Sequence, residues 1–249
     1  MSDKQKTQTK NEARLDQYVT DFLDYLEIDR HCSRLTQRNY RHYLKRFGNW
    51  VFSQRPDFTM ETLDLVTVTK YRVYLSRLET KPGMNLSRAT QDYHLIALRS
   101  FIKLLIKRDV PTLAPEKIEL GKSESRSLKF LTTEQVERLL SSPGISDERQ
   151  LRDKAILEVL FSTGLRVSEL VGLNRETIDF ERREFGVIGK GGRPRVVFLS
   201  VRSGRWLKTY LAKRQDKGKA LFVSDAGRLT VRSVQRLVAK YCHKAKLPV

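Results

Sequence analysis

Apolar side chains recur every three or four residues through the first hundred residues, which is the spacing of one face of an α-helix. Ser87 provides an N-cap side chain ahead of the last such segment, and Pro56 and Pro82-Gly83 separate others. We therefore predict four helices with these apolar positions: Leu15, Val19, Phe22, Leu23 and Leu26; Tyr40, Tyr43, Leu44, Phe47 and Val51; Val68, Tyr71, Leu75 and Leu78; and Tyr93, Ile96, Ala97, Phe101, Leu104 and Leu105.

The helical pattern breaks between residues 110 and 130. Pro111 and Pro115 are followed there by the polar run GKSESRS at 121–127. This composition is typical of an exposed linker, because it has no apolar face to bury. We predict a helical domain over 12–110, a linker over 111–129 and a second domain over 130–249.

The second domain mixes helical and strand-like segments. A capping-box sequence at 132–135 opens one helix, a second over about 147–163 ends at Gly164, and others follow at about 166–172, 206–211 and 231–241. The glycine-rich run at 189–192 predicts a hairpin turn. The predicted strands are Thr177–Phe180, Glu184–Ile188, Arg195–Leu199 and Leu221–Val223. The expected fold class is therefore mainly α with a small antiparallel sheet.

Charge changes this picture more than any other part of the composition. The chain has 48 Lys and Arg against 29 Asp and Glu, which leaves a net charge of +19. Lys and Arg displace counterions from phosphates, so an excess of this size predicts a polyanionic partner. It argues against an ordinary small-metabolite enzyme.

Other classes of protein are disfavoured by what the sequence lacks. The polar start has no apolar signal-peptide core, and no apolar stretch approaches the roughly 18 residues of a membrane span. The two cysteines, Cys32 and Cys242, suggest neither a disulfide scaffold nor a zinc cluster. We therefore expect a cytoplasmic protein beside nucleic acid, with no membrane contact, no metal and no cofactor.

The most specific segment is FSTGLRVSELVGL at 161–173. Gly164 ends one helix and Arg166 opens the next, so Arg166 and Glu169 share a face at a separation of three residues. An arginine held by a carboxylate presents a fixed fork of donors to phosphate oxygens. The alternative is an ordinary surface Arg–Glu pair without a function.

The hairpin sequence GKGGRPR at 189–195 places Lys190 among glycines. Its ammonium group is free to enter a neighbouring cleft, where it could protonate a leaving alkoxide as a general acid. The alternative is a solvated turn lysine. The sequence is not a Walker A loop, because the Ser or Thr after the lysine is missing and a strand follows.

Together the two segments resemble the catalytic domain of tyrosine recombinases, the phage-integrase family. In both, a helix precedes STGLRVSEL, and a small sheet carrying GKGGRPR follows. The preceding region is similar to the family's helical, SAM-like core-binding domain, notably in LTQRNY at 35–40 and ALRSFIKLL at 97–105. The segment FLTTEQVERLL at 130–140 resembles Xer-type members, and the resemblance covers the chain from about residue 12.

The resemblance implies a metal-free reaction in which a tyrosine attacks a DNA phosphodiester, and the strands are then rejoined. Arg166 stands where the family has its first catalytic arginine, Glu169 where it has an associated acid, and Lys190 where a lysine protonates the 5′-oxygen. Two arginines stabilise the phosphoryl group by electrostatic preorganisation. The intact family assembles as tetramers on two DNA sites.

The sequence departs from the family pattern near its end. In the family, a His-x-x-Arg motif and the nucleophilic tyrosine come after a segment like YCHKAKLP at 241–248, and this chain stops at Val249. Tyr241 falls on the apolar face of its helix and His243 has no arginine three residues later, so neither is expected to substitute. We expect a fragment or a naturally shortened product, inactive as it stands and monomeric in solution.

Basic side chains follow two predicted helices of the first domain, and the resemblance implies that helices of this domain contact the major groove. The alternative is a solvated basic face. The candidate contacts with double-stranded DNA, including two on the hairpin, are Arg34, Arg38, Arg41, Lys45, Arg88, Gln91, His94, Arg193 and Arg195.

Two functions remain open at this point. One is site-specific recombination by DNA strand cleavage and rejoining, in a chain that lacks the C-terminal nucleophile. The other is a non-catalytic DNA-binding protein that occupies recombination sites. A helical transcription regulator of other ancestry is a weaker third, because it leaves Arg166, Glu169 and Lys190 unexplained.

Overall fold

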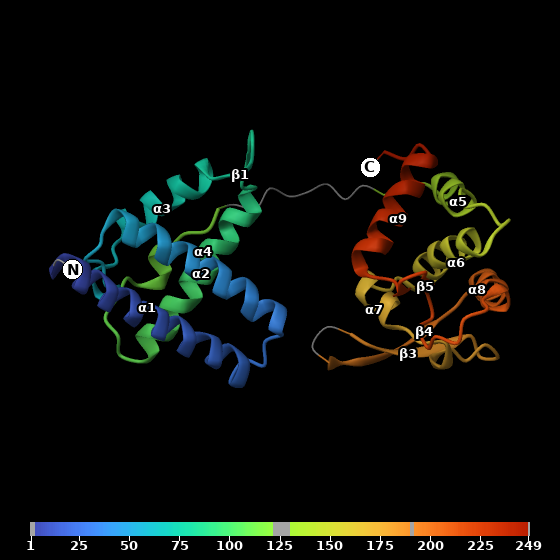
Figure 1. Cartoon of the computed structure of the whole chain (residues 1–249), viewed down its shortest axis with the longest axis horizontal. Coiled ribbons are helices and arrows are strands. Elements are labelled where there is room, and N and C mark those ends of the chain that lie inside the picture. Colours follow the sequence, from blue (N-terminus) through green and yellow to red (C-terminus); the bar gives the residue numbers. More distant parts are fainter. Residues whose placement is uncertain (1–2, 122–129, 190–191, 249) are drawn as a thin grey trace. The chain divides into compact units, whose positions relative to one another are not determined.

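The structure, a computed structural model, describes residues 3–121, 130–189 and 192–248 (Figure 1). It divides into two compact units, Met1–Arg126 and Ser127–Val249, each with its own apolar core. The mainly helical fold with small antiparallel sheets confirms the expected fold class. In the described part of the chain, no helix is long and apolar enough to cross a membrane.

The first unit is built on four helices: α1 (Asp3–Ile28), α2 (Arg34–Gln54), α3 (Leu65–Arg77) and α4 (Arg88–Lys107), with short 3-10 turns η1 (Met60–Thr62) and η2 (Pro115–Lys117). Ser33, Asp64 and Ser87 cap α2, α3 and α4, because each side chain accepts the backbone N–H three residues on. The four predicted helices are thus present. At the centre of their core lie the fully buried rings of Phe22, Phe47, Phe58, Tyr71 and Phe101.

Pro82-Gly83, expected only to separate two helices, forms the turn of a small hairpin. β1 (Glu79–Lys81) pairs antiparallel with β2 (Met84–Asn85). Gly83 has a φ of +73°, which a residue without a Cβ adopts freely. All residues of both strands are exposed, so no apolar alternation marks them in the sequence.

The structure corrects the prediction that His94 contacts DNA. The side chain is buried, with 1% of its surface exposed. Its Nδ1 lies 2.8 Å from the Thr90 carbonyl oxygen, and its Nε2 lies 3.0 Å from Arg46 Nη1. A guanidinium can only donate, so Nε2 accepts, Nδ1–H donates and the ring is neutral. His94 therefore packs α4 against α2.

The second unit is built around α6 (Glu148–Thr163). Its strongest packing is against α8 (Val201–Lys213), and α5 (Thr133–Ser141) also contacts it, while α9 (Val231–Lys244) contacts α5 and α7 (Val167–Gly172). Two antiparallel hairpins complete the unit. β3 (Glu184–Ile188) pairs with β4 (Pro194–Phe198), and β5 (Val223–Ser224) pairs with β6 (Gly227–Arg228).

The predicted strand Thr177–Phe180 is wrong. Its first residue ends a 3-10 turn, η3 (Arg175–Thr177), and an isolated bridge then joins Asp179 to Glu184. The Asp179 carboxylate accepts the N–H groups of Glu181 and Arg182, both at 2.9 Å, and this turns the chain before a strand can extend.

The predicted strand Leu221–Val223 is displaced to Val223–Ser224. Leu221 and Phe222 enter the core instead of pairing in a ladder. A short apolar run of this kind shows that the segment is buried, but the sequence pattern alone does not show whether it forms a strand.

Helix α6 buries three charged side chains, Asp153, Lys154 and Glu158. The hydroxyl of Tyr241 donates to Asp153 at 2.9 Å, Lys154 Nζ lies 3.0 Å from Glu158, and Arg202 donates to Glu158 at 2.8 Å. Each buried charge thus has a partner, which is the condition under which charges persist in a core. The expectation that Tyr241 faces the core is confirmed.

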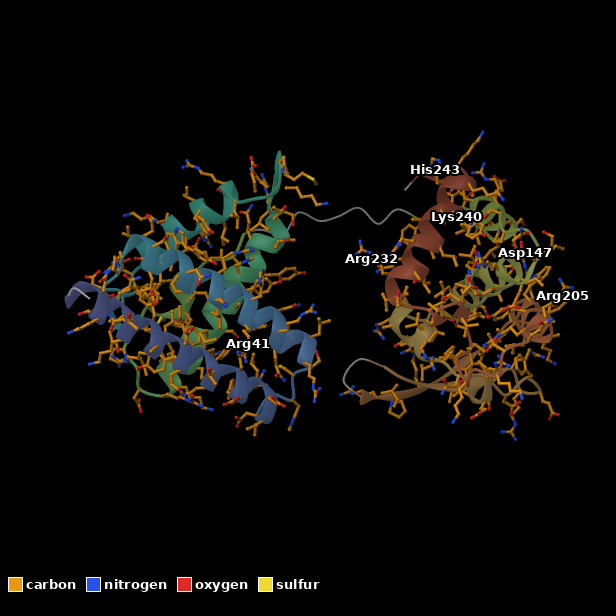
Figure 2. All side chains as sticks on the ribbon, viewed as in Figure 1. Arg41, Asp147, Arg205, Arg232, Lys240 and His243 are labelled. Carbon is orange, nitrogen blue, oxygen red and sulfur yellow. The ribbon has the colours of Figure 1, made fainter. Side chains whose placement is uncertain are left out.

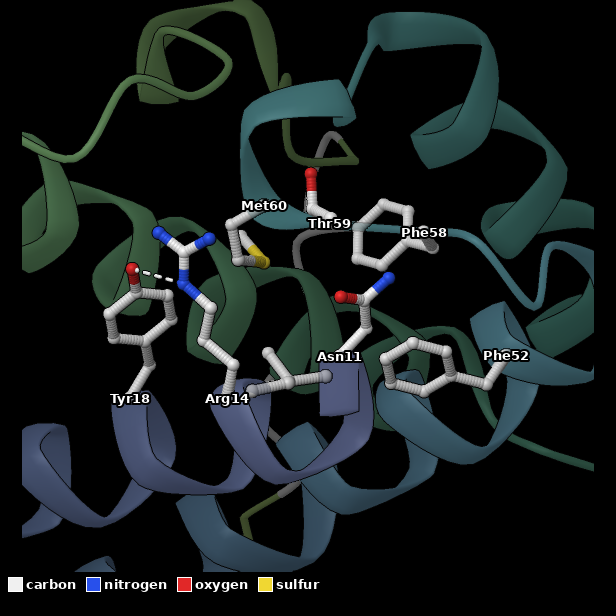
Figure 3. A pocket seen from close by; sticks show the side chains of 8 residues that line it. Asn11, Arg14, Tyr18, Phe52, Phe58, Thr59 and Met60 are labelled. Carbon is white, nitrogen blue, oxygen red and sulfur yellow. Dashed lines mark hydrogen bonds between the residues drawn. The ribbon is translucent and has the colours of Figure 1, made fainter. Parts of the chain in front are cut away.

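A small pocket in the first unit lies beside α1 (Figure 3). Arg14 Nε donates to the Tyr18 hydroxyl at 3.0 Å, and Arg14 Nη2 pairs with Glu61 at 2.7 Å. The cavity has a volume of about 10 Å³, enough for roughly one water. These polar groups therefore join α1 to η1 and do not form a ligand site.

The neutral state of His94 predicts that acid weakens the first unit. Burial lowers the pKa of His94 below its ordinary 6.5, and the charge of Arg46 lowers it further. The unfolded chain takes up the proton near pH 6.5, so this stability is present above that pH and is lost as pH falls through the lower pKa of the folded state. Urea unfolding followed by Trp50 fluorescence, in a Trp206→Phe background, should show the loss.

His94→Gln is the matched variant for this prediction. Glutamine keeps a polar side chain but has no titratable ring, so its loss of stability between about pH 7.5 and 5.5 should be smaller. An equal loss in both proteins would contradict the assignment.

Candidate functional site

The chain reverses direction between α6 and α7, and this places Arg166. Gly164 ends α6 with a φ of +60°, and its N–H bonds the Leu160 carbonyl. Leu165 is buried after it. Arg166 then stands at the N-cap of α7 with extended backbone and an exposed side chain.

The carboxylate of Glu169 joins two arginines from different elements. It accepts the backbone N–H and the Nη1 of Arg166, both at 2.8 Å. Arg195 of β4 donates to both carboxylate oxygens, at 3.0 and 2.9 Å. The predicted Arg166–Glu169 pair is thus formed, and Arg195, expected only as a DNA contact, is its third member.

Burial and charge give this cluster a fixed electrostatic state. Glu169 is 8% exposed, whereas Arg166 is 57% exposed. Hydrogen bonds from Arg195, then from Arg166, hold the pKa of Glu169 at about 2 against the opposing effect of burial. The carboxylate is therefore ionised at neutral pH, and the three side chains carry a net charge of +1. Arg166 presents its remaining donors to solvent, as an anion site requires.

Arg228 of β6 holds the other end of α7. Its Nη1 donates to the carbonyl oxygens of Val171 and Leu173 at 2.7 and 2.9 Å, and its Nη2 donates to Asn174. A cation at these carbonyls satisfies groups that a helix leaves unpaired at its C-terminus. Sequence reasoning missed Arg228, because no local pattern links it to a helix more than fifty residues earlier.

The β3–β4 hairpin carries the remaining predicted residues of this site. Gly189 N–H donates to the Arg193 carbonyl at 2.8 Å, and a Cβ on Gly189 would lie 3.0 Å from Arg195 Nη1. A side chain at this position would therefore crowd Arg195, so glycine leaves room where the hairpin passes it. Arg193 is exposed, and Lys190 lies outside the described residues.

The basic stripe of α2 is confirmed as one exposed face. Arg34, Arg38, Arg41 and Lys45 are all exposed, and their spacing of four, three and four residues keeps them in line along the helix. Figure 2 labels Arg41 on this helix. On α4, Arg88 is exposed at the first turn. Gln91 is half-buried, and its amide donates to the Leu86 carbonyl at 2.8 Å.

A second basic face was missed in the sequence. Arg232, Arg236 and Lys240 are exposed along α9, four residues apart, opposite its buried apolar residues; Figure 2 labels Arg232 and Lys240. The apolar pattern used to predict this helix implies that face directly, since positions between apolar ones point outward. No group of three or more metal-ligating side chains occurs among the described residues.

Two family models match the chain. The model of the phage integrase family matches residues 129–248, and that of the phage integrase N-terminal SAM-like domain matches residues 19–109. Together they cover both units.

Curated relatives match over most of the chain. Tyrosine recombinase XerC of Yersinia pestis is 33% identical over 238 residues, which cover 94% of this chain and 76% of that protein. Tyrosine recombinase XerD of Proteus mirabilis is 34% identical over 209 residues, which cover 83% of this chain and 64% of that protein.

Solved structures show the same fold. A λ integrase dimer bound to a COC′ core site matches with a TM-score of 0.69 and 16% identity, over 94% of this chain and 64% of that one. The XerH site-specific recombinase bound to a palindromic difH substrate matches with a TM-score of 0.66 and 21% identity, over 92% of this chain and 68% of that one.

The shared carboxylate predicts a measurable loss of stability in Glu169→Gln. The substitution removes the charge between two guanidinium groups, so the free energy of unfolding of the second unit should fall by about 1–3 kcal/mol. Urea unfolding followed by Trp206 fluorescence, in a Trp50→Phe background, measures it. Glu176→Gln, at an exposed position of η3, is the matched control.

The contribution of Glu169 to the free energy of unfolding depends on pH in a defined direction. The pKa of Glu169 is about 2 when folded and 4.5 ordinarily, so its contribution is present above about pH 4.5 and is lost as pH falls toward 2. A difference between wild type and Glu169→Gln that stayed constant across this window would contradict the pairing.

Proposed function

The chain belongs to the phage integrase family, and on that premise we propose that it acts in site-specific DNA recombination by strand cleavage and rejoining. The observation that carries this proposal is the cluster of Arg166, Glu169 and Arg195, which leaves one arginine exposed and preorganised at the start of α7. The net charge of +19 supports DNA as the partner. We place the protein in the cytoplasm, where that partner is available.

In this proposal each residue of the cluster has its own role. Arg166 donates to the non-bridging oxygens of the scissile phosphate, where negative charge develops in the transition state. Glu169 is a positioning residue that fixes the Arg166 guanidinium, and Arg195 fixes Glu169. Lys190 protonates the 5′-oxygen as it leaves. No step needs a metal or a cofactor.

Binding in this proposal involves both units. The first carries 23 basic and 16 acidic residues, and the second 25 and 13, so both are positively charged. The proposed contacts exclude the buried His94 and treat Arg195 as the partner of Glu169. They are Arg34, Arg38, Arg41, Lys45, Arg88, Gln91 and Arg193, with Arg232, Arg236 and Lys240 added from α9.

The tyrosines of the second unit favour a non-catalytic variant of this function for the 249-residue chain. That unit contains two, Tyr210 and Tyr241, and both are buried. The Tyr241 hydroxyl donates a hydrogen bond to Asp153, and burial raises the pKa of both hydroxyls. Neither is placed to attack a phosphodiester. We therefore propose a second candidate function for the chain in this form, in which it occupies recombination sites without cutting them.

The basic stripe of α2 predicts a steep salt dependence of DNA binding. If about six phosphates are neutralised, the plot of log affinity against log salt should have a slope near −5. Arg34→Gln/Arg38→Gln should weaken binding and make the slope shallower by about 2, because each lost contact removes about 0.9. Fluorescence anisotropy with a labelled duplex measures both. A wild-type slope near zero would remove the nucleic-acid proposal.

The buried tyrosines predict that this chain forms no covalent adduct with DNA. A nicked suicide substrate traps such adducts, and denaturing gels should show none with the 249-residue protein under conditions where it binds the duplex. Mass spectrometry provides the decisive check. An adduct at Tyr210 or Tyr241 would show that the site has been misassigned. An adduct at a tyrosine of the first unit would mean that the nucleophile comes from a different unit than Arg166, which would also contradict the prediction.

A further inference from the structure

A groove on the first unit has no part in the proposed DNA surface. It lies between the end of α1, the last turns of α4 and η2, and has a volume of about 710 Å³. That volume falls within the range of ligand-binding clefts. Its lining includes Tyr25, Arg30, Lys103, Leu104, Ile106 and Pro115.

The interior of the groove is apolar. Leu26, Leu104 and Pro115 are buried beneath it. Tyr25 is half-buried, and Ile106 is 41% exposed, so both offer apolar surface to an occupant. An apolar concavity of this kind gains free energy when other apolar groups replace water in it.

The rim of the groove is basic. Arg30, Lys103 and Lys107 are exposed, and none has a carboxylate within 4.0 Å among the described residues. Lys107 lies over the Tyr25 ring, 5.8 Å from its centroid. Glu116 is the single acidic residue in the lining. The charge that complements this rim is therefore negative.

These features distinguish the groove from a phosphate-backbone site. A phosphodiester would gain nothing from the buried leucines, because it carries no apolar side chains to place against them. The proposed contact Arg88 begins α4, whereas Lys103 and Lys107 lie 15 and 19 residues later, roughly 22–28 Å along the helix. Charge and hydrophobicity together match an acidic peptide.

We propose that this groove docks an acidic, amphipathic segment of a partner protein. Its apolar side chains lie against Tyr25, Leu104 and Ile106, and its carboxylates pair with Arg30, Lys103 and Lys107. This is the helix-in-groove or extended-peptide mode of recognition, with charge setting the specificity. The inference does not depend on whether the chain cleaves DNA.

The test uses a labelled synthetic peptide of about 12 residues in which Leu and Phe alternate with pairs of Glu and Asp. Its binding to the full 249-residue chain is measured by fluorescence anisotropy. Lys103→Gln/Lys107→Gln should weaken binding by at least about tenfold, because two charge pairs at the rim are lost. A peptide with Lys in place of Glu and Asp should bind at least about tenfold more weakly than the acidic one.

Arg34→Gln/Arg38→Gln is the matched control, since it removes the same charge from exposed positions of the same unit. It should weaken duplex binding and leave peptide binding within about twofold, and Lys103→Gln/Lys107→Gln should do the reverse. Circular dichroism should show that both variants retain their helices.

Four binding results would overturn the proposal. They are the absence of peptide binding, equal binding of the two peptides, an unchanged peptide affinity in Lys103→Gln/Lys107→Gln, and a loss of duplex affinity in that variant as large as in the control. The last would assign the groove to DNA. A dimer seen by light scattering that Lys103→Gln/Lys107→Gln abolishes would instead assign it to a second copy of this chain, which also overturns the proposal.

Discussion

The candidate site depends on one carboxylate shared by two guanidinium groups. Glu169 is almost buried, so its charge would be unfavourable without compensation, and Arg166 and Arg195 supply it from two separate elements. The same bonds fix the orientation of Arg166, because the carboxylate holds both its backbone N–H and its side chain. Two cations and one anion leave a net positive charge, and Arg166 carries it at the surface.

This arrangement is supported from parts of the chain that are distant in sequence. Helix α7 has six residues, too few to be stable alone, and contacts at both ends hold it in place. At its start Glu169 binds Arg195 of β4, and at its end Arg228 of β6 binds the last carbonyl groups. Arg166, to which we assign phosphate binding in the proposed function, is thus positioned by tertiary packing more than by the helix that carries it.

Sequence reasoning succeeds where a pattern is local. Spacing of three residues predicts the Arg166–Glu169 pair, and spacing of four, three and four keeps Arg34 to Lys45 on one face of α2. The prediction for His94 failed because it lies six residues after Arg88 on the same helix. At about 100° per residue, this separation places His94 about 120° around the helix from Arg88, on the face that is buried in the core. Arg195 and Arg228 were beyond reach, since their partners are set by tertiary contacts.

The exposed stripe of α2 is not electrically uniform. Arg41 and Lys45 line a groove whose opposite wall carries Glu12 and Asp16 of α1, so their attraction for a phosphate is partly offset. Arg34 and Arg38 are exposed and do not line that groove, so they do not face Glu12 and Asp16 across it. We therefore expect Arg34 and Arg38 to contribute more than Arg41 and Lys45 to the electrostatic attraction of the proposed DNA surface.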